Sequence, residues 1–165
     1  MALFEITDDS LHPIPLQTFG NLGFRERPDI QRAMRTHIEA ITPGVRTKVI
    51  AEEFGSWEGA NRRIDLLCVD EDANLVVVEL KRDDGAHMDL QALRYAAMIS
   101  TMRFDQAVDA HRKYLADNGS DDDPEQALRE FLQVEDGPVV FTDTVRIVLA
   151  SSKFSSELMT AVLWL

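Results

Sequence analysis

Apolar and polar residues alternate along the chain in patterns that predict a series of helices and strands. From Pro28 to Ile41, apolar side chains recur every three or four residues, which is the period of one face of an α-helix. Proline is favoured at a first helical position, and Pro43-Gly44 ends the pattern. Residues 28–41 are therefore predicted to form a helix with this buried stripe: Ile30, Met34, His37, Ile38 and Ile41.

Three predicted strands follow this helix, at residues 47–54, 63–69 and 74–82. The link between the last two is short and polar, as a hairpin requires. The third strand contains the run Leu75-Val76-Val77-Val78, which is apolar on both faces and therefore marks a strand in the middle of a sheet. The remaining elements are predicted in the order helix, helix, helix, strand and helix, at residues 88–100, 104–115, 124 onward, 144–150, and 155 or 156 to 165.

This order, α-β-β-β-α followed by an insertion and then β-α, predicts a mixed α/β sheet flanked by helices. Residues 1–26 are expected to form an N-terminal extension, because Pro13 and Pro15 limit its regular structure to one short strand near residues 3–6. A single domain is expected at 27–165. The helix predicted from 88 to 100 is apolar nearly all round, so it is expected to be buried against the sheet.

The formal net charge of −12 is unfavourable for a protein that binds nucleic acid, because phosphate contacts draw on lysine and arginine. The charges are unevenly distributed, however. Residues 117–136 contain eight acids and one arginine, whereas residues 31–116 contain fourteen acids and twelve bases. We expect 117–136 to be an acidic insertion that lies away from a nucleic-acid-binding cleft, poorly ordered or forming its rim, because its like charges repel one another and repel phosphate.

Composition and the two ends of the chain exclude several classes of protein. There is no run of eighteen apolar residues, so no membrane span is expected. The first ten residues lack the features of a signal peptide, which predicts a cytoplasmic protein. The single cysteine, Cys68, excludes a disulfide framework and a cysteine-rich zinc site. The apolar end Val162–Leu165 has no polar tail, so we expect the chain to be a fragment of a longer protein.

The residues with candidate chemistry lie at the ends of two adjacent predicted strands. Side chains alternate along a strand, so Glu79 and Lys81 point to one face while Leu80 points to the other. Both charged groups follow a buried apolar run and therefore need partners. The predicted hairpin brings Asp65 close to them. Two carboxylates, a backbone carbonyl and water form a reasonable Mg²⁺ site, and a lysine beside them can position or deprotonate a water and offset phosphate charge.

A glutamate and a lysine after an apolar run usually mark only the solvent-exposed end of a strand. That interpretation weakens here, because Asp65 lies on the preceding strand and the next helix carries Gln91 and Tyr95. These two residues are one helical turn apart on an apolar face, where they need hydrogen-bond partners. The end of the sheet would supply these partners. A purely structural Gln–Tyr network remains the alternative.

Together these residues resemble the PD-(D/E)xK nuclease superfamily, and within it the RecB-type nucleases and the nuclease domain of NucS/EndoMS-like mismatch endonucleases. The resemblance covers residues 28–100 and implies a restriction-endonuclease-like core of order α-β-β-β-α-β. The family's first motif has a proline where this chain has Ile64. The resemblance is carried by these residues: Asp65, Glu79, Leu80, Lys81, Gln91 and Tyr95.

The resemblance implies roles for these residues. Asp65, Glu79 and the Leu80 backbone carbonyl would bind Mg²⁺ or Mn²⁺, and Lys81 would be the catalytic lysine. The pair on the next helix would assist catalysis near the phosphate. The family often adds a glutamate from the first helix or the first strand, and the candidates here are Glu39, Glu52 and Glu53. Of these, Glu39 faces away from the apolar stripe and is expected to be solvated, and we prefer Glu53.

Four arginines surround the proposed site and would suit phosphate contacts: Arg62, Arg63, Arg82 and Arg94. Each is equally compatible with an ordinary surface position or a pair with a nearby aspartate. We therefore expect a Mg²⁺- or Mn²⁺-dependent phosphodiesterase, a DNA endonuclease in preference to an RNA enzyme. The expected partner is nucleic acid, with a second copy of the chain or a further C-terminal domain as candidates. The alternative is an inactive nuclease fold that acts as a nucleic-acid or protein interaction module, which the net charge favours.

Overall fold

A four-stranded mixed sheet forms the centre of the computed structural model, which describes residues 2–55, 63–84 and 88–164. Strands β3 and β5 are each antiparallel to β4, and β6 is parallel to β5. The mixed α/β class is therefore confirmed. In spatial order the strands are β3 (Thr47–Phe54), β4 (Ile64–Asp70), β5 (Leu75–Asp84) and β6 (Val145–Lys153).

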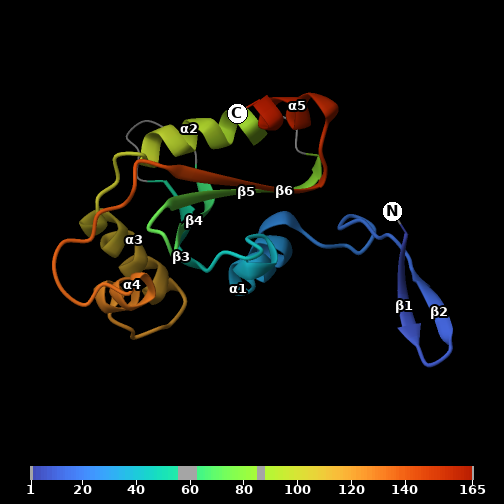
Figure 1. The fold of residues 1–165 in the computed structure, drawn as a ribbon, viewed down its shortest axis with the longest axis horizontal. Coiled ribbons are helices and arrows are strands. Elements are labelled where there is room, and N and C mark those ends of the chain that lie inside the picture. The colour runs from blue at the N-terminus through green and yellow to red at the C-terminus, as the bar shows by residue number, and fades with distance from the viewer. Residues whose placement is uncertain (1, 56–62, 85–87, 165) are drawn as a thin grey trace.

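Helices cover both faces of this sheet. The helices α2 (Met88–Ile99) and α5 (Ser156–Trp164) lie over one face, and α1 (Arg32–Thr36) lies on the other side (Figure 1). Alternate residues of the strands belong to two separate hydrophobic clusters, because successive side chains of a strand point to opposite faces of the sheet. Leu67 and Val77 pack with Tyr95 of α2, whereas Leu66 and Val78 pack with Ile38 near α1.

The helix predicted at 28–41 begins earlier and is divided into three segments. They are the π-helical η1 (Glu26–Gln31), α1, and the 3-10 turn η2 (Ile38–Ala40). His37 ends α1 with φ −127° and ψ 58°, outside the helical region. This break, together with the wider π turn, changes the angular spacing of the side chains. His37 was predicted to belong to the buried stripe, and this was wrong: it is exposed and lies 3.3 Å from Glu39.

Two further expectations about burial are corrected. Helix α2 packs against the sheet but is not buried all round, because Leu90, Leu93 and Met98 are between 38% and 51% exposed. Strand β6 was predicted to be buried, but it is only half-buried. It is the last strand of the sheet, so it has a neighbouring strand on one side only.

The insertion between α2 and β6 consists of α3 (Phe104–Asp117), which packs against β3, and α4 (Pro124–Leu132), which packs against α3. The acidic segment 117–136 is thus partly helical. Asp123 caps α4, because its carboxylate accepts a hydrogen bond from the Gln126 backbone at 2.7 Å. Leu128 of α4 is buried in the core.

A β-bulge interrupts the pairing of β3 with β4. Val49 pairs with Cys68 and Ala51 pairs with Leu67, so Ile50 is an extra residue in β3. The Ile50 carbonyl accepts a hydrogen bond from Nδ1 of the buried His111 on α3, at 3.0 Å. Burial lowers the pKa of His111, so the ring is neutral while it holds the bulge in place.

Residues 1–26 contain more regular structure than their prolines suggest. Strands β1 (Leu3–Thr7) and β2 (Ser10–Ile14) form a hairpin that projects away from the sheet and helices (Figure 1). The second strand was not predicted, because it contains Pro13. A two-stranded hairpin has a free edge on each strand, so it tolerates a residue that lacks an N–H. Every residue of both strands is exposed. None of the helices in the described ranges is long and apolar enough to cross a membrane.

Candidate metal-binding carboxylate site

Asp65 and Glu79 lie at the same level on two neighbouring strands. Leu66 pairs with Val78, and continuing this antiparallel register places Asp65 opposite Glu79. Residues opposite each other on an antiparallel pair project from the same face. Lys81 is two residues beyond Glu79 and projects from that face as well. Glu79 is completely buried and Asp65 is 8% exposed, so the pair is largely removed from water.

Burial perturbs both carboxyl groups. It raises the pKa of Asp65 to about 6 and is also the main cause that raises the pKa of Glu79 to about 8. The negative charge of Asp65 raises the pKa of Glu79 further, and the ammonium group of Lys81 partly offsets the shift in both. The Leu80 backbone N–H donates a hydrogen bond to Asp65 Oδ2 at 2.7 Å, which favours the charged form of Asp65.

Gln91 on α2 connects the site to the helix above it. Its Nε2 donates a hydrogen bond to Glu79 Oε2 at 2.7 Å and lies 3.4 Å from the Tyr95 hydroxyl, one turn further along. The structure therefore brings Gln91 and Tyr95 to the carboxylates. The other oxygen of Glu79, Oε1, is buried and has no hydrogen-bond partner within the described part of the chain.

Replacing Gln91 by alanine removes this hydrogen bond to Glu79. Should the carboxylates bind a divalent cation, we expect Mn²⁺ affinity to fall about ten- to a hundredfold, as when a group that orients a metal ligand is lost. The measurement is Mn²⁺ affinity by calorimetry, with the thermal unfolding temperature recorded for each protein. Gln126→Ala is the matched control, because Gln126 is exposed on α4 and bonds to Glu130. A lower unfolding temperature with unchanged Mn²⁺ affinity would assign Gln91 a structural role only.

Two residues of η1 contact the site, although the sequence pattern did not single them out. The Glu26 carboxylate accepts hydrogen bonds from the Arg82 backbone at 2.9 Å and from Lys81 Nζ at 3.5 Å. Gln31 is buried, and its Nε2 donates to Glu52 at 3.0 Å and to the Asp65 carbonyl at 3.3 Å. Glu26 belongs to the segment predicted as the N-terminal extension, so a residue of that segment contacts the site.

The three candidate glutamates occupy different surroundings. The side chain of Glu39 is 72% exposed, in agreement with its expected solvation. Glu52 pairs with Arg35 at 2.7 Å. Glu53 lies 3.1 Å from Arg27, and its charge raises the pKa of both Asp65 and Glu79. Of the three glutamates, Glu53 is the one within electrostatic reach of both carboxylates.

The fit of these residues to a metal ion can be judged from their chemistry. In the ranges that the structure describes, no three His, Cys, Asp or Glu side chains are placed to hold a metal ion together. Asp65 and Glu79 nevertheless offer a pair of buried carboxylates on adjacent strands, and Oε1 of Glu79 has no hydrogen-bond partner among the described residues. An oxygen-only donor set that leaves room for water fits Mg²⁺ or Mn²⁺.

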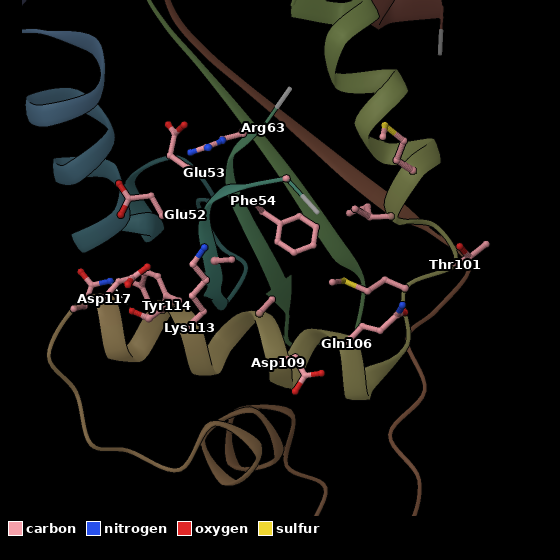
Figure 2. A pocket seen from close by; sticks show the side chains of 17 residues that line it. Glu52, Glu53, Phe54, Arg63, Thr101, Gln106, Asp109, Lys113, Tyr114 and Asp117 are labelled. Carbon is pink, nitrogen blue, oxygen red and sulfur yellow. Dashed lines mark hydrogen bonds between the residues drawn. The ribbon is translucent and has the colours of Figure 1, made fainter. Parts of the chain in front are cut away.

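A cavity of about 740 Å³ lies between the end of β3, the end of α2 and helix α3. Figure 2 shows Glu53 and Arg63 on one side of it, and Lys113, Tyr114 and Asp117 on the opposite side. Its lining does not include Asp65, Glu79 or Lys81. Asp117 begins the acidic segment, so this segment borders the cavity. Glu53 is therefore the link between the cavity and the carboxylate site.

The expected phosphate-binding arginines are spread over several elements. Arg63 precedes β4 and lines the cavity, and Arg94 is exposed on α2. Arg82 on β5 is half-buried, and its backbone is bonded to Glu26. Arg62 lies outside the described residues. The structure thus places the two exposed arginines on different parts of the fold, and it does not show a dense basic groove within the described ranges.

Comparison of the chain with protein-family models, with curated proteins and with solved structures finds no match. The interpretation of the site therefore rests on its own residues. It has to account for two buried carboxylates, a lysine on the same face of the sheet and a glutamine bonded to one of the carboxylates.

Proposed function

We propose that this chain is a divalent-metal-dependent nuclease that hydrolyses phosphodiester bonds, and specifically a DNA endonuclease with a restriction-endonuclease-like core. The observation that carries the proposal is the buried pair of Asp65 and Glu79 beside Lys81. Two carboxylates that repel each other in a site shielded from water destabilise the fold unless a cation or a bound proton neutralises them. A purely structural site has no need of such a pair, and a metal site does.

The side chains have distinct tasks in this proposal. Asp65, Glu79 and the Leu80 carbonyl would hold Mg²⁺ or Mn²⁺, which supplies Lewis acidity to the scissile phosphate and to the attacking water. The Lys81 ammonium group orients that water and offsets the negative charge that develops on the phosphate. Gln91 fixes the Glu79 carboxylate by its hydrogen bond.

A second candidate function is a binding module without turnover. The net charge of −12 favours it, because strong nucleic-acid binding ordinarily uses a basic surface. The spread of Arg63, Arg82 and Arg94 over three different parts of the fold favours it as well. The buried carboxylate pair is not explained by this alternative.

The proposal is tested by replacing Asp65 with asparagine, which keeps an acceptor for the Leu80 N–H and removes the charge. We expect Mn²⁺ binding and cleavage to be lost together, because the site loses one of its two carboxylates. Cleavage is measured on single-stranded, duplex, branched and mismatched DNA, and Mn²⁺ binding by calorimetry. Asp105→Asn is the matched control, because Asp105 is exposed and pairs with Arg103. A wild type that binds DNA and cleaves none of these substrates would support the binding module instead.

A further inference from the structure

The first two residues of η1 pair with the site through opposite charges. The Glu26 carboxylate lies 3.5 Å from Lys81 Nζ, and Arg27 Nε lies 3.1 Å from Glu53 Oε1. Two residues that are adjacent in sequence thus form these ion pairs: Glu26 with Lys81 of the site, and Arg27 with Glu53 beside it. We call Glu26 and Arg27 together the charge clamp. A π-helix such as η1 is rare and is frequently found at functional sites.

Glu53 is held in a way that favours a change of partner. Its φ is +50°, a left-handed conformation that is unfavourable for a residue with a side chain. Both of its carboxylate oxygens are buried, and neither accepts a hydrogen bond from any described residue. The ion pair with Arg27 is the partner that the structure shows for this carboxylate.

The two ion pairs of the charge clamp differ in how easily another ligand can displace them. The Arg27 side chain is 65% exposed, so water and phosphate can reach its guanidinium group while it is paired. Lys81 and Glu26 are 31% and 37% exposed, so their contact is partly shielded. A partly exposed ion pair contributes little net stability, and a stronger partner can therefore displace it.

We propose that the charge clamp competes with a divalent cation for Glu53 and with phosphate for Lys81. Cation binding then frees Arg27, which becomes available to nucleic acid beside the site. The Arg27–Glu53 pair thereby couples the two ligands, since a cation at Glu53 releases Arg27 for phosphate and phosphate on Arg27 releases Glu53 for the cation. This inference rests on the proposed function, and its tests use binding measurements that are independent of cleavage.

The first test is a double-mutant cycle on Arg27 and Glu53, with Mn²⁺ affinity measured by calorimetry on the full chain without nucleic acid. Arg27→Met is expected to tighten Mn²⁺ binding about two- to fivefold, which is the contribution of a partly exposed ion pair. In the Glu53→Gln background the same change is expected to have no effect, because the competing pair is already absent. Arg25→Met is the matched control, because Arg25 pairs with Asp29 at 3.0 Å on the surface.

The second test concerns the other ion pair of the charge clamp. Glu26→Gln retains an acceptor for the Arg82 N–H but releases Lys81, so affinity for a duplex oligonucleotide in EDTA is expected to rise about two- to fivefold. Fluorescence anisotropy measures this affinity. Glu39→Gln removes an equal charge from an exposed position and is expected to have a smaller effect. In the Lys81→Ala background the gain from Glu26→Gln is expected to disappear.

The outcomes separate the clamp from the proposed function. If Arg27→Met tightens Mn²⁺ binding equally in the wild type and in the Glu53→Gln background, its effect comes from the change in net charge. The proposed competition between Arg27 and the cation is then wrong. If Glu26→Gln raises duplex affinity equally in the wild type and in the Lys81→Ala background, the proposed competition between Glu26 and phosphate for Lys81 is wrong for the same reason. If the wild type and Asp65→Asn bind Mn²⁺ equally, the carboxylate site itself is wrong, and the clamp is overturned with it.

Discussion

Replacing Lys81 by alanine is expected to reduce DNA cleavage about a hundred- to ten-thousandfold, the usual contribution of a group that assists proton transfer or stabilises transition-state charge. Nucleic-acid affinity should stay within a few-fold of the wild type, because one phosphate contact is a small share of the total. Lys81 projects from the same face as Asp65 and Glu79, and its charge offsets the pKa shift of both carboxyls.

This prediction is checked by single-turnover cleavage in Mg²⁺ together with affinity measured in Ca²⁺. Lys153→Ala is a suitable control, because it removes an equal charge from an exposed position at the end of β6. Thermal unfolding of each variant shows whether the fold is intact. A Lys81→Ala protein that cleaves as fast as the wild type would contradict the assigned role. Loss of affinity in step with cleavage would make Lys81 a binding residue.

The metal-free protein is expected to lose stability as the pH rises from about 4 to about 8. Asp65 and Glu79 have pKa values of about 6 and about 8 in the folded state, against ordinary values of 3.8 and 4.5. Between these limits the folded chain keeps protons that the unfolded chain has released. The free energy of unfolding therefore falls through this window, by several kcal/mol for the coupled pair.

Urea unfolding in EDTA at pH 5 and pH 8 measures this difference. Adding Mg²⁺ or Mn²⁺ at pH 8 should restore stability, because a ligand that binds only the folded state stabilises it. Glu79→Gln should flatten the pH profile and make the metal-free protein more stable than the wild type at pH 8. Glu39→Gln changes an exposed carboxyl and should leave the profile as it is. A wild-type profile that is flat in EDTA would show that the carboxylates are not buried as a pair.

The strands and the central pair could be predicted because their signals are local. The limits of β3 at Thr47 and Phe54 agree with the pattern of the sequence. A short polar link between two apolar strands fixes an antiparallel register, and this register alone brings Asp65 opposite Glu79. The period of a strand then places Lys81 on the same face. No knowledge of distant contacts was needed for these three residues.

The contacts of η1 could not be predicted in the same way. Glu26 meets Lys81 across more than fifty positions in sequence, and no periodic pattern reports such a contact. The π turn also departs from the spacing on which helix prediction depends, so neither the start of the helix nor the exposure of His37 followed from the stripe. The left-handed conformation of Glu53 has no signal in its residue type, since glycine is the usual occupant of that region.

The bulge at Ile50 restricts how this chain can gain or lose residues during evolution. Beyond the extra residue, the register of β3 places Glu53 level with Asp65, whereas an uninterrupted strand would place Glu52 there. Loss of Ile50 would restore regular pairing and leave Glu53 in its place. Loss of Glu52 with the bulge retained would instead move Glu53 level with Leu66, onto the other face of the sheet. Alignments of related chains should therefore accept a one-residue gap at Ile50 and reject one at Glu52 or Glu53.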